Sequence, residues 1–324
     1  MKNVPILFLI FNRPEVTFKV FKAISAFKPK QLFIAADGPR LNVPSDHFNC
    51  EKTRQVIDLI DWECDLKVLF RDENLGCANA VKDSITWFFN QVDRGIILED
   101  DCLPSPLFYE FCSELLERYK DNDRIMHIGG NNFQLASNSM NTQYYYSQIP
   151  HIWGWATWRR AWTKYNHDFI GLKQFLQTNL ELKISSDLDV RNYWTDCFYY
   201  AFNGKVNAWD YRWCFSILSN QGICITPNEN LVENIGFGED STHTKKGYCP
   251  KLTQMNRSVF KSLTHPSLFE IDRHKDEFTY KALYNVKKNS CLYKKRSYLF
   301  SLIKRLKSRM KSKKRLKELL LKCY

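Results

Sequence analysis

The sequence has little glycine and no long apolar segment, and each shortage excludes a class of protein. Its 324 residues include 12 glycines, and neither GxGxxG nor GxxxxGKS/T occurs, so the dinucleotide fingerprint and the P-loop are absent. No run of about 18 uncharged apolar residues is present to span a bilayer. The apolar run at residues 4–11 is too short for the hydrophobic region and cleavage site of a secretory signal.

The eleven cysteines never occur as a CxxC pair, and their number is odd. A zinc ribbon needs such pairs and a disulfide framework needs an even number, so neither is predicted. This cysteine usage indicates a reducing compartment. Together with the missing secretory signal, it predicts a cytoplasmic protein.

Positive charge is concentrated at the carboxyl end. The whole chain has a net charge of +12, but residues 281–324 contain 16 Lys and Arg and a single acid, Glu318. Residues 1–280 therefore have a net charge of −3. Because this larger part is slightly acidic, it lacks the basic face that nucleic acid needs, and no nucleic-acid partner is predicted.

Short apolar runs alternate with helix-period segments in the first half of the chain. The expected strands are 5–11, 31–36, 66–70 and 95–98, and the expected helices are 14–27, 51–60, 76–90 behind an Asn74 cap, and 105–119. Strands that are apolar on both faces and alternate with helices predict an α/β fold, with a mostly parallel sheet flanked by helices. The sharpest change in composition, near residue 280, predicts one domain (1–280) and a basic tail (281–324).

Polar side chains follow each of these four strands. They are Asn12 and Arg13, then Asp37, then Arg71 and Asn74, and last Glu99, Asp100 and Asp101. Ligands of an open parallel sheet bind at the carboxyl ends of its strands, where these residues are expected to meet. Arginine suits phosphate, and adjacent carboxylates suit a hard divalent cation. The set predicts a site for a nucleoside diphosphate and a metal, although polar residues here also form ordinary turns, and for Asp37 that alternative stays open.

With these motifs the sequence resembles the GT-A fold nucleotide-sugar glycosyltransferases, of the family 2 type found in bacterial surface-polysaccharide biosynthesis. It is also similar to N-acetylglucosaminyltransferase I. The matching segments are VPILFLIFNRP, FIAADGP, NLGCANAV, IILEDDCLPSPLFYEF, GWATWRRAW and AWDYRW. The resemblance covers about residues 4–245 and implies a Rossmann-like GT-A domain, with a nucleotide-binding half (1–130) and an acceptor half (131–280).

The resemblance also implies roles for the residues at the strand ends. Asp101 would bind Mn²⁺ or Mg²⁺, and Asp100 and Glu99 would hold the ribose or the donor sugar. The nucleotide-sugar donor would further contact Asn12, Arg13, Asp37, Arg71 and Asn74, with Asp37 on the edge of the base. Uridine is the base that the family implies.

By the same resemblance, Asp210 in AWDYRW would be the base that takes the proton of the acceptor hydroxyl. An Asp at the start of a helix also caps it, so this alternative stays open. Asp196, one helix earlier, is the second candidate for the base.

The Trp-rich block at 151–162 has a spacing that predicts a turn running into a helix. Trp153, Gly154 and Trp155 are expected to line the donor-sugar or acceptor side, with the glycine allowing close approach of a ligand. His243 resembles a late metal ligand of some GT-A enzymes, although a lone His in a polar loop is more often solvated. His127 and His151 are expected to be structural.

The tail places Leu299, Ile303, Leu306 and Met310 at helical spacing among many Lys and Arg. Such a basic amphipathic helix suits anionic lipid, at ~1 kcal/mol per cation near the surface. It predicts peripheral attachment to the inner face of the membrane, with a nucleic-acid arm or a merely solvated helix as alternatives.

The predicted function is a metal-dependent, inverting hexosyl- or N-acetylhexosaminyltransferase that moves a sugar from a UDP-sugar to a hydroxyl of a glycan or lipid-linked glycan. One alternative is a sugar nucleotidyltransferase, but the glycine-rich basic loop that such enzymes have after the first strand is missing. The other alternative is a non-catalytic glycan-binding or scaffold protein at the membrane.

Overall fold

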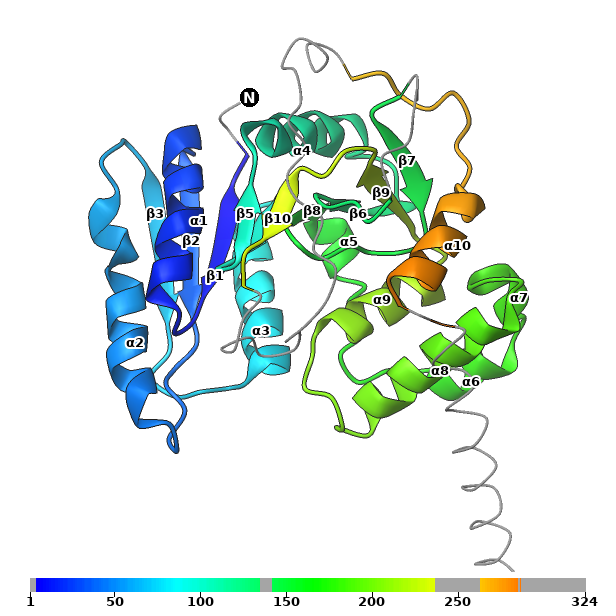
Figure 1. The fold of residues 1–324 in the computed structure, drawn as a ribbon, viewed down its shortest axis with the longest axis horizontal. Coiled ribbons are helices and arrows are strands. Elements are labelled where there is room, and N and C mark those ends of the chain that lie inside the picture. The colour runs from blue at the N-terminus through cyan, green and yellow to red at the C-terminus, as the bar shows by residue number, and fades with distance from the viewer. Residues whose placement is uncertain (1–3, 135–141, 237–262, 285, 287–324) are drawn as a thin grey trace, which may run out of the picture.

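The fold is built on one eight-stranded sheet, seen in the computed structural model, which describes residues 4–134, 142–236, 263–284 and 286 (Figure 1). The strand order is β3-β2-β1-β4-β8-β6-β9-β7. In chain order these strands are β1 (Ile6–Ile10), β2 (Gln31–Ala36), β3 (Asp65–Phe70), β4 (Arg94–Glu99), β6 (Ile125–Gly129), β7 (Tyr144–Ser147), β8 (Trp155–Trp158) and β9 (Ile223–Pro227). A separate two-stranded sheet pairs β5 (Cys102–Pro104) with β10 (Val232–Asn234).

Helices flank the sheet. They are α1 (Pro14–Phe27), α2 (Pro44–Arg54), the 3-10 helix η1 (Gln55–Leu59), α3 (Cys77–Phe89), α4 (Pro106–Arg118), α5 (Arg159–Trp162), α6 (Leu172–Gln177), α7 (Leu180–Lys183), α8 (Leu188–Phe202), α9 (Asp210–Ser219) and α10 (Arg273–Ala282). Strands β3, β2, β1 and β4 are mutually parallel, and β6 and β9 are parallel to each other. Strands β8 and β7 run antiparallel to their neighbours. The predicted α/β class with a mostly parallel, helix-flanked sheet is confirmed.

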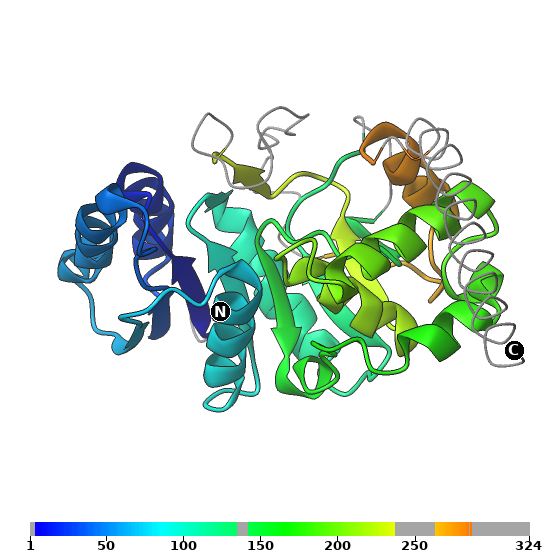
Figure 2. The same ribbon diagram turned by 90° about the horizontal axis from the view of Figure 1, so that it is seen from below.

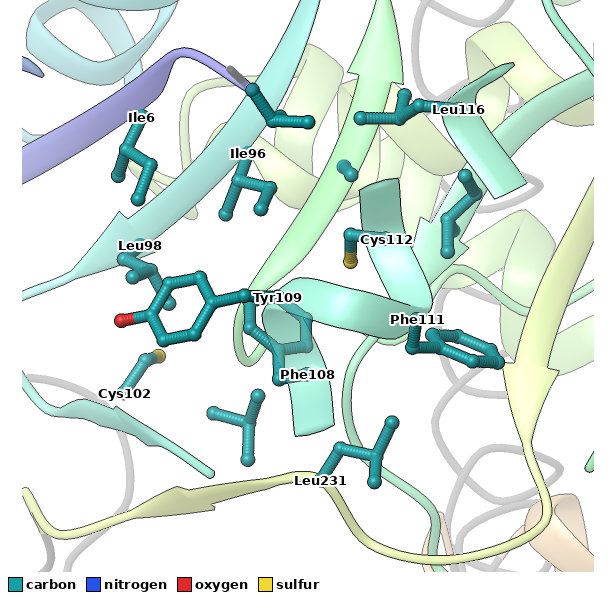
Figure 3. Close-up of a cluster of buried hydrophobic side chains, with 14 of the residues drawn as sticks. Ile6, Ile96, Leu98, Cys102, Phe108, Tyr109, Phe111, Cys112, Leu116 and Leu231 are labelled. Carbon is teal, nitrogen blue, oxygen red and sulfur yellow. The ribbon is translucent and has the colours of Figure 1, made fainter. Parts of the chain in front are cut away.

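Alternating residues of the strands fill two different cores. On β1, Ile6 and Phe8 enter a cluster with α1 and α4, whereas Leu7 and Leu9 enter a cluster with α3 on the other face. Figure 3 shows part of the first cluster, where Tyr109 and other α4 side chains lie among residues of β1 and β4. Burial on both faces is the reason why these strands appear in the sequence as continuous apolar runs.

Two elements differ from the sequence prediction. Helix α2 begins at Pro44, seven positions before the predicted start at residue 51, because a proline in its first turn suits a helix start even where the residues are polar. The tryptophan block forms strand β8 before a short helix, and β8 lies between β4 and β6. Trp155 and Trp158 enter cores on opposite faces, which is the two-residue periodicity of a strand.

Helices α6, α8, α9 and α10 enclose a third core of mostly aromatic side chains. This helical unit lies at the opposite end of the molecule from α1 and α2 (Figures 1 and 2). Helix α10 continues past residue 280 to Ala282, and Tyr284 stacks on Tyr193 of α8 with ring centroids 5.3 Å apart. Val286 is buried in the same core. Tail residues 287–324 lie outside the described residues.

A buried carboxyl group attaches α10 to the end of β7. Asp276 accepts hydrogen bonds from the Ser147 hydroxyl at 2.5 Å and from the backbone N–H of Gln148 at 2.9 Å. Burial raises the pKa of Asp276 to about 7, although both hydrogen bonds oppose the rise. The folded protein therefore holds this proton in a pH range where an unfolded chain releases it.

We expect Asp276→Asn to remove a pH dependence of stability. Because the folded pKa lies above the unfolded value of 3.8, the contribution is full at low pH and is lost as pH rises from about 4 to 7. The slope is at most about 1.4 kcal/mol per pH unit. Urea unfolding at pH 5, 6, 7 and 8 measures it as the difference between wild type and variant. Glu277→Gln on the same helix is the control, and a difference that stays constant with pH would contradict the assignment.

Candidate functional site

The parallel register brings the predicted strand-end residues to one edge of the sheet. Ile10 pairs with Ala36, which in turn pairs with Phe70. Leu9 pairs with Glu99 on the other side of β1. The residues that directly follow β1, β2, β3 and β4 therefore lie side by side, as the sequence predicts for a ligand site of an open sheet.

Arg13 is paired with two of the three carboxylates after β4. Its Nη2 donates to Asp100 Oδ1 and, at 3.0 Å, to Asp101 Oδ2, while Nε donates to Asp100 Oδ2 at 3.4 Å. The side chains of Arg13, Asp100 and Asp101 are 21%, 5% and 16% exposed. Burial opposes the charged guanidinium, but the two carboxylates outweigh it and raise the pKa of Arg13. The arrangement is a forked, partly buried ion pair.

Glu99 has no such cation in direct contact in the described structure. Burial, together with repulsion by Asp101 and Asp100, raises the pKa of Glu99 to about 8. Burial also raises the pKa of Asp100, although Arg13 opposes the rise. This rise favours the protonated form of Glu99, whose O–H can donate a hydrogen bond where a carboxylate could only accept one.

Of the two predicted metal ligands, Asp101 and His243, only Asp101 lies in the described part of the chain. A divalent cation of this type needs several oxygen ligands, and in this structure Asp101 Oδ2 accepts from Arg13 Nη2. Within the described ranges, no group of three or more His, Cys, Asp or Glu side chains is placed to hold a metal ion. His243, the other predicted ligand, lies outside those ranges. Asp101 is thus paired with Arg13 here, and its role as a metal ligand stays a prediction.

Strand β10 and the residues after it cover this acidic edge. The backbone N–H of Ile235 donates to the Asp101 carbonyl at 2.8 Å. A Cβ added to Gly236 would lie 2.4 Å from Asp101 Oδ2 and 2.8 Å from Arg13 Nη1, so a side chain here would displace the ion pair. Sequence reasoning missed Gly236, because nothing local shows that it meets residues more than 130 positions away.

Asp37 and Asn74 join two loops at this edge. Asp37 Oδ1 accepts from the N–H groups of Gly38 and Leu75, each at 3.0 Å, and Oδ2 accepts from that of Gly76 at 3.1 Å. Asn74 Nδ2 donates to the Gly38 carbonyl at 2.8 Å, and the residue before α3 is Gly76, so Asn74 is not the helix cap. These contacts are the ones expected if Asp37 forms an ordinary turn, which is the alternative to ligand binding.

Asn12 and Arg71 also have protein partners. Asn12 Nδ2 donates at 2.7 Å to Asp46, a buried carboxylate that also pairs with Arg40. The hydrogen bonds from Arg40 lower the pKa of Asp46. Arg71 Nη1 donates to Ser84 Oγ at 3.1 Å. Sequence analysis missed Asp46. The available signal was its position in the first turn of a helix that begins at Pro44.

Trp155 does not line the site. Its side chain is fully buried and stacks between Trp209, at 5.4 Å, and His127, at 5.1 Å. His127 accepts from Trp213 Nε1 at 3.2 Å, and burial lowers its pKa to about 4. His127 and the buried His151 are structural, as expected, and Trp155 is corrected from a ligand residue to a core residue.

Close packing against neighbouring side chains, and not the approach of a ligand, explains why position 154 is a glycine. Its φ is +64°, and an added Cβ would lie 2.8 Å from Val232 Cγ2 and 3.2 Å from Leu98 Cδ2. Glycine is therefore needed to let β10 pass. Trp153 is half-buried and its ring meets that of Phe133 at 5.0 Å, so of the three predicted residues only Trp153 is partly exposed.

Asp210 is the first residue of α9, and its charge acts on Glu99 at the end of β4. Oδ1 accepts from the N–H of Tyr211 at 2.9 Å, and the cap position is occupied by Trp209 without a side-chain cap bond. A carboxylate in the first turn is favoured by the helix dipole. Burial raises the pKa of Cys197, and the charges of Asp196 on α8 and of Asp210 add to the rise, so both candidates act on the same thiol.

Asn207 connects the loop before α9 to the start of α3. Its Oδ1 accepts from the N–H of Ala78 at 3.1 Å, and its Nδ2 lies 2.7 Å from where a Cβ of Gly76 would be. Gly76 has a φ of +76° and donates to Asp37. Asn207 was missed in the sequence because its partner is 129 positions away.

The chain has weak similarities to known proteins. No protein-family model matches it, and no curated protein does. A crystal structure of HddC from Yersinia pseudotuberculosis is 9% identical with a TM-score of 0.34, over 51% of this chain and 80% of that one. The same protein complexed with GMP-PN is 10% identical with a TM-score of 0.30, over 48% and 77%.

A third similar structure is 4-diphosphocytidyl-2C-methyl-D-erythritolsynthase from Anaerococcus prevotii, 8% identical with a TM-score of 0.30, over 55% of this chain and 86% of that one. None of these similarities shows a family for this chain. Among the residues that the structure describes, no helix is long and apolar enough to cross a membrane.

Proposed function

We propose that this chain is a glycosyltransferase that moves a sugar from a nucleotide-sugar donor to a hydroxyl group. The observation that carries the proposal is the single edge where Arg13, Glu99, Asp100 and Asp101 meet, with Asp210 close to Glu99 on a different element. A cation, hydrogen-bonding carboxyl groups and a separate carboxylate are what such a transfer needs. Uridine as the base comes from the sequence resemblance.

In this proposal each side chain has a role in a single displacement. The acceptor oxygen attacks the anomeric carbon while the bond from that carbon to the diphosphate oxygen breaks, and the proton of the acceptor goes to Asp210. Arg13, held by Asp100 and Asp101, faces the negative charge that develops on the leaving diphosphate. Attack opposite the leaving group inverts the anomeric carbon. The predicted divalent cation would be held by Asp101 and would supply further positive charge at the leaving diphosphate.

A sugar nucleotidyltransferase is the second candidate, since acidic residues after a strand of a mostly parallel sheet suit it as well. Such an enzyme must hold a triphosphate after the first strand. Here β1 ends at Ile10 and α1 begins at Pro14, so residues 11–13 leave no room for a glycine-rich loop. This short connection favours glycosyl transfer.

A panel of nucleotide sugars tests the proposal and separates it from the alternatives. We expect a UDP-sugar to raise the melting temperature and to be hydrolysed slowly, with UDP released, in Mn²⁺ but not in EDTA. Pyrophosphate release from UTP and a sugar 1-phosphate would establish nucleotidyl transfer instead. Binding of glycans without release of any nucleotide would establish the non-catalytic scaffold, and equal UDP-sugar turnover in EDTA and in Mn²⁺ would refute the metal.

The basic segment 281–324 is proposed to hold the protein at anionic lipid. It contains 16 Lys and Arg against one acid, whereas residues 1–280 have a net charge of −3. Cations near an anionic surface contribute ~1 kcal/mol each, so this segment alone supplies a strong attraction. The acceptor would then be a glycan at the inner face of the membrane, in keeping with a lipid-linked substrate.

We expect Asn207→Ala to slow transfer by about 10- to 100-fold, because loss of its bond to Ala78 lets the loop before Asp210 shift. The free energy of unfolding should fall by only about 1 kcal/mol. Initial rates should show a lower kcat with the KM of the donor unchanged. Asn207→Asp, which keeps the acceptor oxygen, should restore the rate, and Asn203→Ala, which loses a local bond to Tyr199, is the control. Equal rates in Asn207→Ala and wild type would refute this role.

A further inference from the structure

Three large apolar side chains are exposed together on the helical unit. Ile170 is 78% exposed, Phe202 54% and Tyr199 51%. Tyr199 and Phe202 are on the last turn of α8, and Ile170 is two residues before α6. We call these three residues, with the neighbouring Lys173 and Lys205, the α6–α8 patch. Soluble surfaces seldom expose a group of large apolar side chains without a partner.

A hollow of about 490 Å³ lies between the two helices of the patch. It is lined by Phe169, Leu172, Lys173, Leu176, Tyr199 and Phe202, among others. All the residues that line the hollow belong to the described part of the chain, and Lys173 is the only charged residue among them. An apolar surface with a tyrosine and lysines at its margin has the composition of protein surfaces that enter the headgroup region of a bilayer. There a tyrosine ring contacts lipid while its hydroxyl contacts water, and the lysine side chains reach the lipid phosphates.

The patch lies on the same unit from which the basic segment leaves the described structure. Tyr284 stacks on Tyr193 of α8, and Val286 is buried in the core beneath α6 and α8. Figure 1 shows α10 and α8 in the same helical part of the molecule, on the side away from α1 and α2. The next 38 residues, 287–324, contain 15 Lys and Arg and one acid. A surface that attracts this segment therefore comes close to the patch.

We propose that the α6–α8 patch is a second membrane contact, inserting into the headgroup region of an anionic bilayer while residues 287–324 provide the electrostatic attraction. The basic segment alone would bind the surface without orienting the protein. The patch supplies a defined face, because its apolar side chains are fixed on two packed helices. This inference deepens the proposed membrane partner and does not depend on which transfer reaction the site performs.

Flotation of the full chain with vesicles tests the patch. Wild type should float with phosphatidylcholine vesicles that contain 30% phosphatidylglycerol, and not with pure phosphatidylcholine. The triple variant Ile170→Ser, Tyr199→Ser, Phe202→Ser should float at least fivefold less. The matched control is Leu41→Ser with Phe48→Ser, which removes two exposed apolar side chains (96% and 66% exposed) near α2 and should float like wild type. Phe202→Trp, which keeps an interfacial ring, should float at least as well as wild type.

The outcomes distinguish the patch from the other proposals. Unchanged flotation of the triple variant, with an unchanged melting temperature, would overturn the patch while leaving the basic segment in place. The patch would also be overturned if deletion of residues 287–324 abolished flotation while the triple variant floated like wild type. A wild type that dimerises without vesicles, and a triple variant that is monomeric by sedimentation, would show that a second copy covers the patch. Hydrolysis of nucleotide sugar in solution should be the same in all variants, so failure here leaves the proposed reaction untouched.

Discussion

Replacing Arg13 by glutamine should lower the free energy of unfolding by about 3–5 kcal/mol, the usual loss when one partner of a buried ion pair is removed. The variant leaves Asp100, only 5% exposed, and Asp101 without their cation at the end of a buried strand. Burial already raises the pKa of Asp100, and it should rise further without Arg13. Urea unfolding at pH 7 measures the loss. Nucleotide-sugar binding should weaken in the same variant, because the guanidinium is the cation of the proposed diphosphate site.

Two further variants show whether the ion pair is the cause. Arg13→Gln combined with Asp100→Asn removes one of the stranded charges and should recover part of the stability. Lys120→Gln breaks a half-exposed pair with Glu117 and should cost less than about 1 kcal/mol. A loss below 1 kcal/mol for Arg13→Gln would mean that water, and not Arg13, compensates the two carboxylates.

Asp210→Asn should reduce the rate of transfer by about 10²- to 10⁴-fold, the typical contribution of a general base. The amide keeps the shape of the side chain and can still accept from the N–H of Tyr211, so the start of α9 should be preserved. Initial rates with the best UDP-sugar and acceptor measure the effect. The rise in melting temperature caused by UDP should stay as in wild type, because the base acts on the acceptor and not on the nucleotide.

Asp196→Asn is the matched control for this variant, since Asp196 lies on the neighbouring helix α8 and also acts on Cys197. We expect it to keep most of the activity. If Asp196→Asn loses transfer and Asp210→Asn keeps it, the base is Asp196. If both variants retain full activity, the reaction is not the one proposed.

Much of the fold can be predicted from local pattern. Helix α1 begins at Pro14 and ends at Phe27, as its proline start and apolar spacing indicate. Strand β2 also has its predicted bounds, because a run buried on both faces is distinctive. Strand β8 was mistaken for a turn and a helix, since Trp155 and Trp158 are spaced as a helix face would be. Their assignment to a strand depends on pairing with β4 and β6.

The sequence by itself determined the alternation of β1 to β4 with their helices, the acidic triplet after β4 and the charge difference between the body and its last 44 residues. These features depend on local periodicity and composition. Tertiary structure alone decided that Arg13 pairs with carboxylates 87 and 88 positions away, that Trp155 is buried, and that Gly236 has no room for a side chain. The physical reason is that the burial and the charge partner of a side chain are set by segments distant in sequence. The same carboxylate binds a cation in one surrounding and an arginine in another.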